Sequence, residues 1–225
     1  MKRALYLAAA AACIAAFAGT LYLIFYVAPI DRLLLFNQKI FYYHVANAWV
    51  LFAAVFTCGV ASLLYLRKRQ GKHDDLARAA GELAVLFGAI VLVTGSIWGK
   101  AAWDIWWDWE ARLTMSLLLW MTMVGYILVR QYGGPGSERM AAGLAFFAAV
   151  NVPLVYFSVK IWRTLHPQTS VVPSLEGGMR AAMWSSVALF MVFYVLVLIV
   201  RMQLARDERR LTELREQALD AGIIQ

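Results

Sequence analysis

The chain has 225 residues, of which 62% are hydrophobic and only 16% are charged. An ordinary soluble domain is roughly a quarter charged, so this composition excludes a soluble globular protein and indicates a membrane protein. The formal net charge is +7, but the basic residues lie at the ends of apolar runs and form no patch on a polar domain. We therefore interpret them as signals of membrane topology, not of nucleic-acid binding.

The apolar residues come in runs of about twenty, which is enough to cross a hydrocarbon layer about 30 Å thick. We predict an all-α integral membrane protein with one domain, 1–225, and six transmembrane helices at about 4–28, 44–66, 83–98, 113–129, 140–160 and 181–200. The tail, 201–225, has leucines at near-helical spacing among many charges. This pattern predicts that the last span continues as a helix beyond the membrane.

Orientation follows from Lys and Arg in the short connecting segments, because cytoplasmic segments carry the excess. If both termini lie in the cytoplasm, 14 of the 21 Lys and Arg residues fall on the cytoplasmic side. We therefore expect both termini to be cytoplasmic, with the loops after the first, third and fifth spans outside. Few ionisable residues lie near the middle of a span, which disfavours an ion-coupled transporter.

Tryptophan is concentrated in one predicted outer loop, 98–112. Five of the nine tryptophans lie there, namely Trp98, Trp103, Trp106, Trp107 and Trp109. An aromatic belt at the membrane interface explains one or two of them. If residues 103–110 form a short interfacial helix, one face carries three of these indoles together with Glu110. Such a face suits a large flat apolar ligand such as a porphyrin, whereas a quinone fits less fully and a partner helix is a further alternative.

Two of the three histidines fall on the same predicted side as this loop. His44 opens the second span and His166 lies between the fifth and sixth, whereas His73 lies in a cytoplasmic loop among charged residues. A lone interfacial histidine usually only forms hydrogen bonds, but two beside a tryptophan cluster suggest axial ligation of iron. Four basic residues on that side either pair with ligand carboxylates or extend toward lipid headgroups: Lys39, Lys100, Arg112 and Arg163.

Three stretches carry most of these features. They are Lys39-Ile-Phe-Tyr-Tyr-His44-Val-Ala-Asn-Ala-Trp49, Trp98-Gly through Trp106-Trp107-Asp-Trp109-Glu110-Ala-Arg112-Leu-Thr114, and Val155 through Lys160-Ile-Trp162-Arg-Thr-Leu-His166. In this order they resemble the tryptophan-rich heme-handling family of cytochrome c biogenesis, and within it the six-span heme exporter protein C group. One departure is Glu110, which stands where that family usually has Asp.

The resemblance implies that 98–112 is a platform for heme b, bound non-covalently, on the periplasmic face of a bacterial inner membrane. It implies that the platform residues are Trp98, Trp103, Trp106, Trp107, Trp109, Glu110 and Arg112, and that His44 and His166 are the axial ligands of the iron. It further implies that heme is presented, without catalysis, to a periplasmic heme chaperone. The partners implied are the ATPase and permease subunits of an ABC transporter and a small membrane subunit.

Two other functional classes are alternatives to a non-catalytic heme-binding protein. The first is an enzyme, either a heme lyase or a quinone-linked membrane oxidoreductase. A lyase is expected to have larger soluble portions, and electron transfer across the membrane needs a second histidine pair within the spans. The other class is a heme permease, which is expected to bind heme on both sides of the membrane, whereas only His73 lies on the inner side.

Overall fold

The computed structural model describes residues 2–134, 136–168, 170–175 and 177–223. In these residues the fold is all-α, and six helices are long and apolar enough to cross a membrane. The α-helices are α1 (Lys2–Tyr22), α2 (Lys39–Lys68), α3 (Gly71–Trp103), α4 (Ala111–Tyr132), α5 (Ser137–Ile161), α6 (Val171–Ser174) and α7 (Gly177–Asp220). A π-helical turn, Leu23–Val27, extends α1, and a 3-10 turn, Phe36–Gln38, precedes α2. The predicted fold class is thus confirmed.

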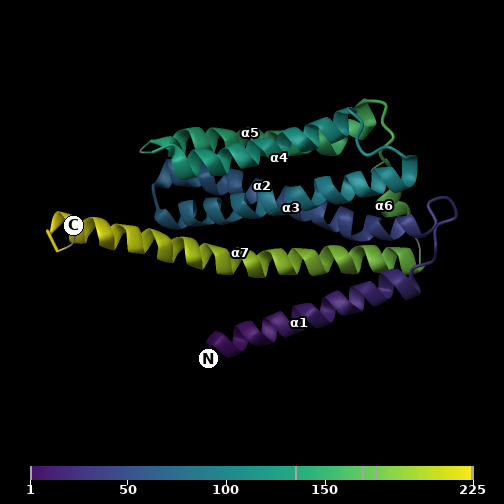
Figure 1. Cartoon of the computed structure of the whole chain (residues 1–225), viewed down its shortest axis with the longest axis horizontal. Coiled ribbons are helices and arrows are strands. Elements are labelled where there is room, and N and C mark those ends of the chain that lie inside the picture. Colours follow the sequence, from purple (N-terminus) through teal and green to yellow (C-terminus); the bar gives the residue numbers. More distant parts are fainter. Residues whose placement is uncertain (1, 135, 169, 176, 224–225) are drawn as a thin grey trace.

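Helices α2 and α3 form the centre of the bundle (Figure 1). They pack on each other, α4 and α5 lie along one side, α7 lies along the other, and α1 packs mainly against α7. The interior is rich in alanines that are almost fully buried: Ala46, Ala54, Ala80, Ala84, Ala145 and Ala148. Because lipid tails are as apolar as leucine, helices in a membrane associate through close packing of small residues. The alanines allow this close approach.

The bundle has two distinct ends. The loops that join α1 to α2, α3 to α4 and α5 to α7 all lie at one end, whereas both chain termini lie at the other (Figure 1). We call the first the histidine end, since it carries His44 and His166, and the second the terminal end. All three loops that were predicted to share one side of the membrane therefore share one end of the bundle.

Two helices are longer than their apolar runs. Helix α3 begins well before the predicted third span, because its polar first turns have charged partners on other helices. Arg130 of α4 forms two bonds of 2.6 Å with Asp74, and Arg209 of α7 forms two bonds of 3.0 Å with the buried Asp75. Helix α7 continues through Asp220, as its leucine spacing predicts. Arg209 also attaches this extension to the start of α3.

The predicted interfacial helix over 103–110 is wrong. Helix α3 runs on to Trp103 and ends there, because Asp104 takes a left-handed conformation with φ 61° and its N–H donates to the carbonyl of Lys100 at 3.1 Å. This is a common way to end a helix. Residues 104–110 then continue as an irregular loop to α4. The indoles of this loop are consequently not arranged by helical periodicity.

Gly88 offers a test of the contact between α3 and α4. A methyl group at this position would lie 2.6 Å from Cδ1 of Trp120, whose indole N–H donates to the carbonyl of Val85 at 3.0 Å. We expect Gly88→Ala to lower the free energy of unfolding by about 1 to 3 kcal/mol, because the indole must move in a packed interior.

Gly143→Ala is the matched control for Gly88→Ala, since nothing within 4 Å would meet its added methyl group. Both changes raise helix propensity by about 1 kcal/mol, so the difference between them reports the clash. Thermal unfolding in one detergent measures that difference. Equal unfolding midpoints would contradict the close contact.

Candidate functional site

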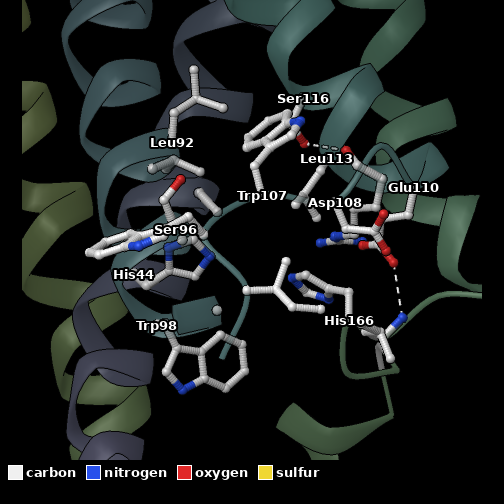
Figure 2. A pocket seen from close by; sticks show the side chains of 18 of the residues that line it. His44, Leu92, Ser96, Trp98, Trp107, Asp108, Glu110, Leu113, Ser116 and His166 are labelled. Carbon is white, nitrogen blue, oxygen red and sulfur yellow. Dashed lines mark hydrogen bonds between the residues drawn. The ribbon is translucent and has the colours of Figure 1, made fainter. Parts of the chain in front are cut away.

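Several segments enclose a cavity at the histidine end (Figure 2). It has a volume of about 80 Å³, and its walls come from α2, the end of α3, the loop before α4, the start of α4 and the loop before α6. Eight of the nine predicted site residues line it: His44, Trp98, Trp103, Trp106, Trp107, Glu110, Arg112 and His166. Trp109 does not line it and is 72% exposed. We call this space the tryptophan cavity.

His44 is held in a defined tautomer. It is buried on α2, and its Nδ1 lies 2.9 Å from Oγ1 of Thr94 on α3. The Thr94 hydroxyl donates its only proton to the carbonyl of Ile90 at 2.7 Å, so it accepts from His44. Nδ1 therefore carries the proton, and Nε2 keeps a free lone pair at the cavity wall.

His166 has the same tautomer for a different reason. Its Nδ1 lies 3.0 Å from the carbonyl oxygen of Pro167, which can only accept a hydrogen bond. Burial lowers the pKa of His166 to about 3, and the positive charge of Arg112 adds to this effect. The imidazole is therefore neutral near pH 7. Both histidines thus present an unprotonated Nε2, which is the form that binds a metal.

Trp98 contacts both histidines. Its ring centroid is 6.3 Å from that of His44 and 6.4 Å from that of His166. It is 3% exposed and also contacts Trp103, with ring centroids 5.2 Å apart. Figure 2 shows the two imidazoles on opposite sides of the cavity, with Trp98 at its edge. One indole thereby contacts two potential ligands that lie far apart in the sequence.

The cavity wall contains polar atoms without partners. Among the described residues, Nε1 of Trp98, Nε1 of Trp107 and Oε1 of Glu110 are buried and form no hydrogen bond. Most buried polar groups in native proteins are paired, so unpaired ones need a reason. Three of them around one cavity are consistent with a ligand that brings polar groups of its own.

Glu110 connects the tryptophan loop to the loop that carries His166. Its Oε2 accepts a hydrogen bond from the hydroxyl of Thr164 and another, of 2.9 Å, from the N–H of Leu165. Oγ1 of Thr164 in turn accepts from the N–H of His166 at 2.9 Å. The carboxylate therefore sets the backbone position of the second histidine. Thr164 and Thr94 were not predicted as site residues, because isolated hydroxyl residues form no recognisable motif.

Arg112 is the basic residue that reaches the cavity. Its guanidinium donates to the carbonyls of Val155 and Tyr156 on α5, at 3.2 and 3.4 Å. In the part of the chain that the structure describes, it forms no ion pair. Lys39 instead donates to the carbonyl of Ala28 at 2.6 Å. Arg112 therefore supplies a positive charge at the cavity wall that no carboxylate neutralises directly.

The whole chain matches a known protein family. The family described as "Heme exporter protein C" matches residues 1–221. A protein of that name from Escherichia coli strain K12 is 34% identical over 184 residues, which cover 77% of this chain and 74% of the relative.

Two further relatives show how far the similarity extends. The heme exporter protein C of Bradyrhizobium diazoefficiens is 38% identical over 139 residues, 60% of this chain but only about half, 52%, of the relative's length. A putative cytochrome c biosynthesis ccmC-like mitochondrial protein of Marchantia polymorpha is 32% identical over 154 residues, 68% of this chain and 66% of that protein. With the match over residues 1–221, these similarities place the chain in the heme exporter protein C family, whose members are heme-handling membrane proteins of cytochrome c biogenesis.

Proposed function

We propose that this protein binds heme b non-covalently at the histidine end, with His44 and His166 as axial ligands of the iron. The observation that carries the proposal is that two imidazoles on opposite sides of one cavity both have Nδ1 bonded to an oxygen acceptor. A neutral imidazole whose Nδ1 proton is already bonded offers Nε2 to a metal without losing a proton. The arrangement is thus ready for iron before the ligand arrives.

His44 and His166 are better suited to a metal ion that a macrocycle already holds than to a free metal ion. A structural zinc site uses four protein ligands, and a catalytic one uses three. No cluster of three or more His, Cys, Asp or Glu side chains suited to a metal ion occurs in the described residues. Heme iron receives four nitrogen ligands from the porphyrin and needs only the axial positions from the protein. Two histidines are sufficient for it.

The other groups at the cavity match the remaining parts of heme. Stacking and edge contacts with Trp98, Trp103 and Trp107 bury a flat apolar ring at little cost in side-chain entropy. The guanidinium of Arg112 can pair with a propionate, because carboxylates are the ligands that its planar fork binds best. The unpaired indole N–H groups of Trp98 and Trp107 are further donors.

We further propose that the histidine end faces the periplasm and passes heme to a periplasmic heme chaperone. The excess of Lys and Arg near the terminal end supports this orientation in a bacterial inner membrane. Trp106 lines the cavity and is 60% exposed, and the exposed Trp109 lies beside it in the same loop. Exposed indoles next to a binding site form a contact surface for an acceptor protein. Family membership supports ABC transporter subunits and a small membrane subunit as the other partners.

The purified protein should show the Soret band of low-spin six-coordinate heme. His44→Ala and His166→Ala should each shift the spectrum toward high-spin iron and weaken binding, because each variant loses one axial ligand. His73→Ala, at the terminal end, is the control and should match the wild type. Absorption spectra of the ferric and ferrous forms check this. An unchanged spectrum in the double variant would contradict the proposal, and thioether formation by this chain alone would favour a lyase.

Thr94→Val tests the tautomer of His44. The change keeps the shape of the side chain but removes the acceptor for the Nδ1 proton, so the imidazole becomes less basic and less well oriented. We expect the heme affinity to fall about 10- to 100-fold. Thr57→Val is the control, because that hydroxyl lies further along α2 and donates to the carbonyl of Ala53. Heme titrations followed at the Soret band compare the two variants, and equal affinities would refute the assigned tautomer.

Glu110→Gln tests whether the carboxylate positions His166. An amide accepts the bonds from Thr164 and Leu165 less strongly than a carboxylate does, so we expect about tenfold weaker binding and a larger high-spin fraction. Glu110→Asp should retain most of the low-spin signal, since it keeps the charge. Glu138→Gln, on α5 at the terminal end, controls for loss of a carboxylate. Electron paramagnetic resonance of the ferric protein measures the spin states; wild-type spectra for Glu110→Gln would show that the link has no positioning role.

A further inference from the structure

A second cavity adjoins the tryptophan cavity. Its volume is about 260 Å³. Its lining includes a stripe of α2, Tyr156 of α5, Val171 to Pro173 of α6 and Trp184 of α7. The stripe consists of residues at helical spacing: Phe41, Val45, Ala48, Trp49 and Phe52. We call this space the lateral cavity.

The two cavities meet at the proposed axial ligands. Both are lined by His44, Arg112 and His166. A ring ligated on both faces lies between the two imidazoles, so its edges must extend to either side of the line that joins them. Ordinary ligand pockets have volumes of roughly 300 to 1,000 Å³. Neither cavity reaches that range alone, but the two together do.

Two partly exposed indoles, those of Trp49 and Trp184, line the lateral cavity. Trp49 lies about 15 Å along α2 from the residue at which the helix begins, and Trp184 lies about 10 Å along α7. Helix α2 is about 45 Å long, so if it is centred in the bilayer it exceeds the hydrocarbon layer by about 7 Å at each end. Trp49 therefore lies deeper than the headgroup region, yet it is 41% exposed, and Trp184 is 46% exposed. Indoles exposed at this depth contact acyl chains.

We propose that the lateral cavity is the lipid-side half of the heme site, in which Trp49 and Trp184 contact one edge of the porphyrin. This inference rests on the proposed heme-binding function. The ring spans both cavities, with one edge below the tryptophan loop and the other between α5 and α7. Because the second edge borders the bilayer, heme dissolved in the membrane reaches the histidines sideways, without crossing an aqueous phase.

The test measures the affinity of the full chain, in phospholipid nanodiscs, for iron protoporphyrin IX. Trp49→Ala and Trp184→Ala should each weaken binding about tenfold while the Soret maximum stays in place, because the axial ligands are unchanged. Trp184→Phe should recover most of the affinity, since an aromatic contact is retained. Phe56→Ala is the control: Phe56 lies two turns after Trp49, is also exposed, and lines neither cavity.

The outcomes separate this inference from the proposed function. Absence of a Soret band in the wild type would contradict the proposed heme-binding function itself. A normal wild-type spectrum, with Trp49→Ala and Trp184→Ala binding heme as tightly as Phe56→Ala does, would overturn the inference alone and leave the lateral cavity to an acyl chain. Because the two tryptophans belong to different helices, misfolding of one variant leaves the other as a valid test.

Discussion

The site depends on the hydrogen bonds that two imidazole Nδ1–H groups donate. Each Nδ1–H is directed at an oxygen, Oγ1 of Thr94 for His44 and the carbonyl of Pro167 for His166. Each Nε2 is thereby left with a free lone pair at a residue that lines the tryptophan cavity. The helices and loops around the cavity must hold both lone pairs in place if one metal is to bind them.

The position of Thr94 depends on contacts far from the cavity. A threonine on α3 meets a histidine on α2 only if the two helices keep one register along their whole length. Buried alanines set how closely they approach, and at the terminal end Asp75 of α3 is held by Arg209 of α7. Since apolar burial does not drive helices together in lipid, such specific contacts replace the hydrophobic effect as the source of register.

The sequence predicted the features that follow from a single physical constraint. It did not predict the features that depend on local backbone geometry or on contacts between distant residues. Six apolar runs predicted six spans, because the thickness of the bilayer fixes their length. The loop 103–110 was predicted as a helix from the spacing of its indoles, but the left-handed conformation of Asp104 ends α3 just before it. Trp49 and Trp184 were not predicted as site residues, because the lateral cavity is formed by side chains of five helices. No pattern of residues along the sequence reveals a cavity of this kind.

In the proposed arrangement the site borders two media, and this fits the chemistry of the proposed ligand. Heme has an apolar ring and two charged propionates, so neither water nor lipid alone is a good solvent for it. Trp106 and Trp109 give the tryptophan loop an exposed aromatic surface, whereas Trp49 and Trp184 give the lateral cavity a lipid-facing one. A site that encloses its ligand completely must unfold locally to release it. A site with an opening to each medium can accept the ring from one and pass it to a partner in the other while the axial histidines stay fixed on the bundle.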